Sequence, residues 1–159
     1  MTWRVAALLC GFASALAAQE LPTAGWDSTT KTWTAELRQG TVTRWVSPDG
    51  ALSRVAVRLT GDHAEWALDF YFRNDSLLHA FDRAADGVEN RYTFAEGTLV
   101  RWLARMAPDA PEFEQDPEDA AYYDAAIRIP ELARCWVRFH MVSDANWDRW
   151  GEETGCGVL

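Results

Sequence analysis

The residues that could carry out acid–base or nucleophilic catalysis are few and scattered. The chain has 159 residues and three histidines, which are His63, His79 and His140. His63 follows Asp62, and Ser53 precedes both, so a His–Asp–Ser set can be written from sequence alone. Neither a Gly-x-Ser-x-Gly elbow nor a phosphate-binding glycine loop accompanies these residues. We therefore predict no catalytic residues and expect a protein that is not an enzyme, with a hydrolase as the least favoured alternative.

A metal site is the second chemistry to consider, because acidic residues gather between positions 109 and 124. Carboxylate oxygens are the ligands that calcium prefers. The segment lacks the Asp-x-Asp-x-Asp-Gly spacing of a calcium loop, and His140 stands near Cys135 without Cys-x-x-Cys or His-x-x-x-His spacing. We predict that the acidic segment is a solvated helix start, with no metal and no cofactor.

Tryptophan is the third candidate, since the chain has nine of them. Trp45 and Trp102 are out of phase with the apolar neighbours Val46 and Leu103, which predicts that both project from a second face of a sheet. Exposed aromatic side chains mark sugar-binding or protein-binding surfaces. The alternative is that both sheet faces are covered. The candidate ligand-binding residues are Trp45 and Trp102 with their neighbours Arg44 and Arg101.

These side chains must be positioned by β-strands. Residues 65–72 alternate between apolar and polar positions, apart from Ala67 and Tyr71, as in a strand with one buried face. Residues 70–81 align with residues 92–103 at a period of 22 residues, matching Phe72 with Phe94 and Leu77 with Leu99. This repeat predicts two β-hairpins, with three-residue loops at 73–75 and 95–97 and Asp75 or Gly97 in the left-handed conformation.

The segment before these hairpins, residues 32–59, shows the same alternation of apolar and polar residues. Alternating runs at 32–38, 41–46 and 52–59 predict strands, with turns at Gln39-Gly40 and at Ser47-Pro48-Asp49-Gly50. The short, regular spacing predicts an antiparallel meander of about seven strands between about residues 30 and 104.

The last part of the chain, about residues 112–159, changes pattern. Asp116 followed by Pro117 predicts a helix start, and Tyr122 and Ile129 belong to an apolar stripe at helical spacing. Pro130 is expected to end or kink that helix. Residues 131–142 fit either a helix or a strand, and we favour a second helix. The predicted fold class is therefore α+β, a meander with a C-terminal helical segment packed on one face.

The N-terminus indicates export. Residues 1–18 combine Arg4, an apolar run too short to span a bilayer and small residues, as in a secretory signal peptide. A single domain, residues 19–159, would remain in the periplasm or outside the cell. Two cysteines in an exported chain predict a disulfide between Cys135 and Cys156. Removal of Arg4 changes the formal net charge from −9 to −10, which disfavours nucleic acid and anionic membranes as partners.

One segment resembles a known group. Residues 92–102, Tyr-Thr-Phe-Ala-Glu-Gly-Thr-Leu-Val-Arg-Trp, are similar to a hairpin in small uncharacterised exported bacterial proteins. In that group an aromatic-x-aromatic…Gly-x-Leu pattern recurs along a meander and an acidic helix follows. The resemblance covers about residues 30–130 and implies no catalytic or binding residues.

Together these patterns predict a non-catalytic exported binding module for an unknown protein or glycan. The alternative is a proteinaceous inhibitor of a basic cell-wall hydrolase of the lysozyme kind, because an acidic surface is steered towards a basic enzyme.

Overall fold

The structure, a computed structural model, describes residues 23–35, 38–61 and 64–141. Every strand pairs antiparallel with the next one along the chain, which gives one sheet with the order β1 to β8. A single long helix follows the sheet in the described residues and confirms the predicted α+β meander. The elements are β1 (Asp27–Ala35), β2 (Arg38–Val46), β3 (Leu52–Gly61), β4 (Ala64–Arg73), β5 (Ser76–Arg83), β6 (Glu89–Ala95), β7 (Thr98–Arg105), β8 (Phe113–Glu114) and α1 (Ala120–Met141).

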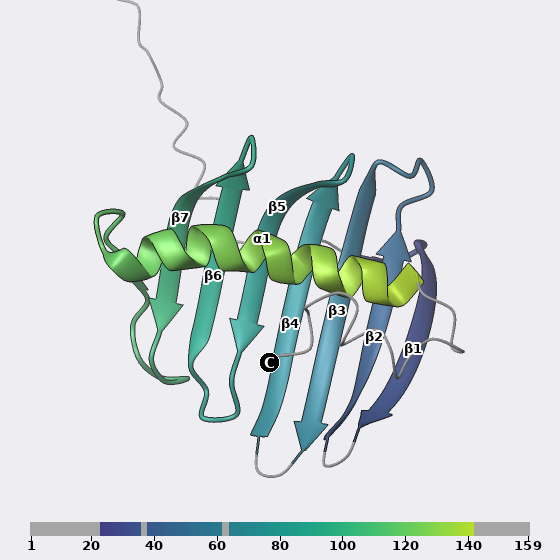
Figure 1. The fold of residues 1–159 in the computed structure, drawn as a ribbon, viewed down its shortest axis with the longest axis horizontal. Coiled ribbons are helices and arrows are strands. Elements are labelled where there is room, and N and C mark those ends of the chain that lie inside the picture. Colours follow the sequence, from purple (N-terminus) through teal and green to yellow (C-terminus); the bar gives the residue numbers. More distant parts are fainter. Residues whose placement is uncertain (1–22, 36–37, 62–63, 142–159) are drawn as a thin grey trace, which may run out of the picture.

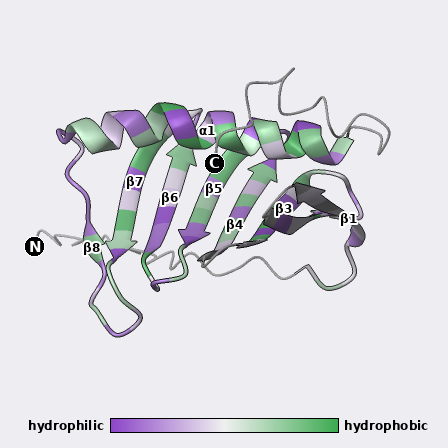
Figure 2. Ribbon diagram, turned by 60° about the horizontal axis from the view of Figure 1, so that its bottom comes forward, coloured by the Kyte–Doolittle hydropathy of each residue, from purple (hydrophilic) through white to green (hydrophobic). Residues whose placement is uncertain are grey.

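The helix α1 lies across the strands on one side of the sheet, from β7 to β1 (Figure 1). We call this side the helix face and the other side the open face, because no described helix or strand packs on the latter. Hydropathy alternates along the strands, as Figure 2 shows. Val55, Val57 and Phe70 point to the helix face and are at most 1% exposed. They share the hydrophobic core with Ile129 and Ala133 of α1.

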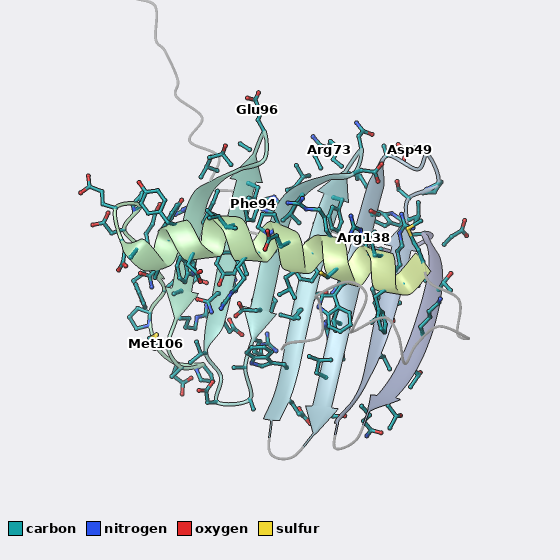
Figure 3. The ribbon with its side chains drawn as sticks, in the orientation of Figure 1. Asp49, Arg73, Phe94, Glu96, Met106 and Arg138 are labelled. Carbon is teal, nitrogen blue, oxygen red and sulfur yellow. The ribbon has the colours of Figure 1, made fainter. Side chains whose placement is uncertain are left out.

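The two repeated hairpins are tighter than predicted. Their loops have two residues each, Asn74-Asp75 and Glu96-Gly97, and all four φ angles are positive, between 48° and 79°. Positive φ at both loop positions is the signature of a type I′ turn, so the prediction of three-residue loops is wrong. The left-handed conformation expected for Asp75 and Gly97 is confirmed. Both turns lie on the same side of the sheet, at the ends of their strands, where Figure 3 labels Arg73 and Glu96.

A β-bulge follows each of these turns. Phe72 pairs with Leu77 and Tyr71 with His79, so Leu78 is an extra residue in β5. In the same way, Phe94 pairs with Leu99 and Thr93 with Arg101, so Val100 is an extra residue in β7. An inserted residue reverses the alternation of the side chains beyond it. The 22-residue repeat therefore includes the bulge as well as the turn.

The first hairpin also differs from its prediction. Gln39 and Gly40 lie inside β2, where Gly40 pairs with Trp33 of β1 and Leu59 of β3, so they do not form a turn. The turn at residues 47–50 is confirmed. There the Gly50 amide donates to the Ser47 carbonyl at 2.8 Å, and Gly50 has a φ of +73°.

The helix begins three residues after Pro117 and is not ended by Pro130. The carboxylate of Asp119 accepts a hydrogen bond from the Ala121 amide at 2.9 Å and caps α1. Asp116 instead accepts from the Glu118 amide, which stabilises the turn before the helix. The helix continues through Pro130 to Met141. Residues 131–141 are therefore the second half of one helix, neither a strand nor a separate helix.

Several predictions fall wholly or partly outside the described residues. These predictions are the signal peptide at 1–18, the Asp62–His63 part of the hypothetical catalytic set, and Cys156. Cys135 lies on α1 and is disulfide-bonded, while its pairing with Cys156 stays a prediction. No helix in the described part of the chain has the length and apolar character needed to cross a membrane.

Candidate binding face

The antiparallel register arranges the open-face side chains in rows that cross the strands. Residues paired directly between neighbouring strands point to the same face, and neighbouring strands lie about 4.8 Å apart. The first row contains Trp45, Arg54, Tyr71, His79, Thr93 and Arg101. The second row contains Thr43, Ala56, Asp69, Phe81, Arg91 and Leu103. The third row contains Thr41, Arg58, Ala67, Arg83, Glu89 and Arg105.

One carboxylate organises the β3–β4 part of this face. Asp69 has a side chain only 2% exposed, and it accepts from Arg54 Nε at 2.8 Å and from Arg58 Nη2 at 2.8 Å. The Arg54 guanidinium lies 5.0 Å from the ring centroid of Trp45 and 5.4 Å from that of Tyr71. Cation–π contacts of this kind hold a guanidinium in place. We call Asp69, Arg54 and Arg58 the Asp69 cluster.

A second cluster lies across β5, β6 and β7. Glu89 contacts three arginines, with Nε of Arg83 at 2.7 Å, Nη1 of Arg105 at 3.5 Å and Nη2 of Arg91 at 3.8 Å. Glu112 contacts Arg91 at 2.8 Å and Arg105 at 3.1 Å. The ring of Phe81 lies beneath two of these cations, 5.5 Å from Arg83 and 5.8 Å from Arg91. We call these three arginines and two glutamates the Glu89 cluster.

The two clusters share their carboxylates differently. In the Asp69 cluster, Arg54 and Arg58 both pair with Asp69, and in the Glu89 cluster three arginines share two carboxylates. This concentration of arginine occurs in a chain whose formal net charge is −9. The most exposed of these arginines are Arg83, at 56%, and Arg58, at 45%. They stand in the third row with only the small side chain of Ala67 between them.

The four sequence-predicted binding residues are divided between the two faces. Trp45 and Arg101 lie on the open face, on β2 and β7 in the first row, and Arg101 pairs with Glu114 at 3.3 Å. Arg44 pairs with the core residue Val55 and therefore lies on the helix face. Trp102 lies there too, because the bulge at Val100 reverses the alternation. The expectation that Trp45 and Trp102 share one face is therefore wrong.

Trp102 takes part in a polar network on the helix face that the sequence pattern does not predict. Its Nε1 donates to Asn90 at 2.9 Å, and Asn90 donates in turn to Asp82 at 2.8 Å. The Tyr92 hydroxyl donates to the other oxygen of Asp82 at 3.2 Å. Burial raises the pKa of the Asp82 carboxyl, and the two hydrogen bonds oppose that rise. Since Asp82, Asn90 and Trp102 come from β5, β6 and β7, the network stabilises the packing of these strands.

The described histidines lie on opposite sides of the sheet. His79 is on the open face between Tyr71 and Thr93, and burial lowers its pKa. His140 is on α1 and bonds the carbonyl of Thr29 at 2.9 Å; burial is the main cause that lowers its pKa. Within residues 23–35, 38–61 and 64–141, no group of three or more His, Cys, Asp or Glu side chains is arranged to hold a metal ion.

The sequence contains part of the signal for the two arginine clusters. Arg54, Ala56 and Arg58 alternate with Val55 and Val57, so period two alone places both arginines opposite the core. Their convergence on Asp69 depends on the register between β3 and β4, which alternation does not specify.

In comparisons with known proteins, no family model, curated protein or solved structure matches this chain.

Proposed function

We propose that this protein is a non-catalytic binding module that presents the open face of its sheet to an anionic ligand. The observation that carries the proposal is the Glu89 cluster of that face, in which three arginines share two carboxylates. A ligand anion would add negative charge to this cluster. Arginine suits this role because its planar guanidinium donates two parallel hydrogen bonds to a carboxylate.

The rigidity of the face favours binding. Aromatic rings and carboxylates already hold the arginines of both clusters, so a ligand would order few additional side chains. Arg58 and Arg83 remain about half-exposed and reach solvent. Trp45 on β2 and Arg101 on β7, two of the residues expected to bind ligand, lie on either side of this area in the first row.

The test is retention of the purified protein on a carboxylate-bearing resin at low ionic strength. Net negative charge alone predicts repulsion, so retention would require a local basic face. We expect retention that is lost in the double variant Arg58→Gln, Arg83→Gln. The matched control is Arg134→Gln, Arg138→Gln, which removes the same charge from α1; Figure 3 labels Arg138 on that helix. Flow-through of the unchanged protein, or equal loss in both variants, would refute the proposal.

The inhibitor of a basic cell-wall hydrolase is the second candidate. The observation that favours it is a set of exposed acidic side chains around the start of α1: Asp109, Asp116, Glu118, Asp119 and Asp124. Charge steering would bring these side chains towards a basic enzyme and would weaken as salt rises. The test is a lysozyme activity assay at low and high salt, with Asp116→Asn, Glu118→Gln as the variant; no inhibition at low salt excludes this candidate.

Export to the periplasm or the medium belongs to the same proposal, and it rests on the signal-like residues 1–18. N-terminal sequencing of the protein recovered from cell fractions tests it. A mature chain that begins near residue 19 in an exported fraction is the expected result.

A further inference from the structure

We propose that the outer edge of β1 pairs with β1 of a second copy of this chain, so that two copies join their sheets across a two-fold axis. The outer edge is the side of β1 that faces away from β2. This inference goes beyond the proposed function and does not depend on it, because the edge is distinct from the open face. It follows from the direction of the backbone groups of β1, from the difference between the two ends of the sheet, and from the distribution of charge.

The hydrogen-bond pattern shows which backbone groups of β1 face outwards. The Ser47 amide donates to the Leu52 carbonyl at 2.9 Å, so this pair at the end of the β2–β3 ladder is hydrogen-bonded. Bonded and non-bonded pairs alternate along an antiparallel ladder. Arg44, three positions before Ser47, is therefore not bonded to β3 and instead bonds its partner Thr29 in β1. By the same alternation, the residues of β1 whose N–H and C=O groups face outwards are Ser28, Thr30, Thr32 and Thr34.

These four residues form an exposed and regular edge. All four are exposed, and in the described part of the chain β1 pairs with β2 alone. The helix contacts β1 through His140, which bonds the carbonyl of Thr29 at 2.9 Å, and Thr29 is a residue that faces β2. The register of β1 with β2 runs over nine residues without a bulge, and β1 contains no proline. A long, uninterrupted edge strand is a template for pairing with another chain.

The other end of the sheet is protected against such pairing. There the edge strand β8 has only two residues, Phe113–Glu114, and it lies between Pro111 and Pro117 in the sequence. Short edge strands, prolines and charged side chains are the usual means of keeping a sheet edge from pairing. β1 has a single charged residue, Lys31, between Ser28 and Ala35. The two ends of the sheet therefore differ in their capacity to accept a further strand, and β1 is the end that can.

The distribution of charge favours contact at the β1 end. Residues 109–124, which include β8 and the start of α1, have seven acidic side chains and no basic one. Residues 27–46, which include β1 and β2, have two acidic and three basic side chains. Figure 1 shows β1 and the start of α1 at opposite ends of the sheet. Two copies therefore repel each other less when their β1 ends meet and their acidic ends lie far apart.

The strand is also complementary to itself. When Thr30 lies opposite Thr30 of the second copy, Ser28 lies opposite Thr32, so each of these hydroxyl groups meets another one. The chain already contains such a pair, because Thr30 Oγ1 and Thr43 Oγ1 are 2.9 Å apart between β1 and β2. Hydroxyl pairs across strands contribute to pairing, whereas like charges directly opposite oppose it. In this register Lys31 lies opposite a threonine of the second copy, so no like charges meet.

The two-fold arrangement brings the helices together as well. Directly paired residues point to the same face, so both open faces lie on one side of the joined sheet and both helices lie on the other. The C-terminal end of α1 lies at the β1 side of the sheet, as Figure 1 shows. Its last residue, Met141, is 69% exposed. The joined sheet would bring the Met141 side chains of the two copies towards each other, which adds an apolar contact to the backbone hydrogen bonds.

The experiment is sedimentation equilibrium of the purified protein between about 5 μM and about 500 μM, where mass action populates a dimer at the higher concentrations. Thr32→Pro removes an outward-facing N–H without removing a hydrogen bond to β2, so it should weaken the dimer about tenfold or more. The matched control is Thr32→Val, which keeps the N–H and the branched side chain and should dimerise as the unchanged protein does. A circular dichroism melt checks that both variants fold.

Hydrogen exchange on the unchanged protein gives a second readout that does not depend on the folding of Thr32→Pro. The amides of Ser28, Thr30, Thr32 and Thr34 should exchange more slowly as the protein concentration rises, because dimer formation gives them acceptors. A monomer at every concentration would overturn the inference and would leave this edge to a strand of another protein. A folded Thr32→Pro variant that dimerises at full strength, or exchange at these amides that is independent of concentration, would also overturn it. None of these outcomes bears on retention by the carboxylate resin, which tests the proposed function separately.

Discussion

The two faces of the sheet bury side chains by different means, and β4 shows both. Phe70 on the helix face is 1% exposed and lies in the apolar core with α1. Its neighbours Asp69 and Tyr71 on the open face are 2% and 5% exposed, although no described element packs over them. Arg54 lies over Tyr71 and pairs with Asp69. Side chains of the helix face are buried by hydrophobic packing, whereas on the open face the stems and guanidinium groups of arginines lie against Asp69 and Tyr71.

The largest effect should come from removing the centre of the helix face. Phe70→Ala should lower the free energy of unfolding by about 4 kcal/mol, because it creates a cavity beneath α1. Urea denaturation followed by tryptophan fluorescence measures the change. Phe113→Ala, which truncates a ring that is 42% exposed, is the control and should cost less than about 1 kcal/mol. Equal losses in the two variants would mean that the helix face is not the main source of stability.

The open face should be sensitive at Asp69. Asp69→Ala removes the shared acceptor of Arg54 and Arg58, whose ion pairs with Asp69 involve a carboxylate that is only 2% exposed. We expect a loss of about 3 kcal/mol, since the variant breaks two ion pairs with a buried carboxylate. The same denaturation assay applies, with Glu65→Ala, at an exposed position of β4, as the control. A loss no greater than that of the control would show that arginines do not organise this face.

Period-two alternation in the sequence predicts most of the difference between the two faces of the sheet. It predicts the meander, the core side of Leu68, Phe70 and Phe72 and the opposite side of Arg54 and Arg58, although Trp66, in phase with that core side, is 39% exposed. It failed at Trp102 because Val100 is inserted one residue after Leu99, and both are apolar residues that suit either face. Nothing in the hydrophobic pattern distinguishes a bulge from a continuous strand at that point.

The clusters and the helix show a second limit of sequence-based prediction. Glu89 pairs with arginines of three strands, and Glu112 reaches Arg91, which is 21 positions away in the chain. Such convergence depends on register and on the path of β8, neither of which local patterns specify. The observed start of α1 differs from the predicted start for a local reason. Asp116 and Asp119 are both suitable helix caps, and only Asp119 caps α1.

The type I′ turns allow a smaller test that affects both faces together, because they set the register of the hairpins. Gly97 has a φ of +79° and open space around its Cα, so Gly97→Val should cost about 2 kcal/mol through backbone strain alone. A thermal melt measures this cost. Ala95→Val, at the exposed end of β6, is the control and should change little. An unchanged melting temperature in Gly97→Val would mean that the turn does not determine the register.

The helix face should show a modest pH dependence that arises at Asp82. Burial raises the pKa of Asp82, so the folded protein holds this proton more tightly than the unfolded chain does. Stability from this group is therefore present below its unfolded pKa and is lost as pH rises through the folded value. Asp82→Asn should flatten that fall in unfolding free energy, as measured by urea denaturation between pH 4 and pH 8. Asp109→Asn, which changes an exposed loop carboxylate, should keep the wild-type slope; a steeper fall in Asp82→Asn would reverse our assignment.

The smallest effect is expected at the end of the open face. Arg101 and Glu114 form a pair whose side chains are 47% and 56% exposed, and each ion in it has its own counter-ion. Exposed pairs contribute little to stability, so Arg101→Gln should change the unfolding free energy by less than about 0.5 kcal/mol. Because this pair is neutral, the same variant should keep most of the resin retention that the double variant Arg58→Gln, Arg83→Gln loses. Comparable loss of binding in both variants would mean that the whole first row contacts the ligand, and it would extend the site from the two clusters to the residues between Trp45 and Arg101.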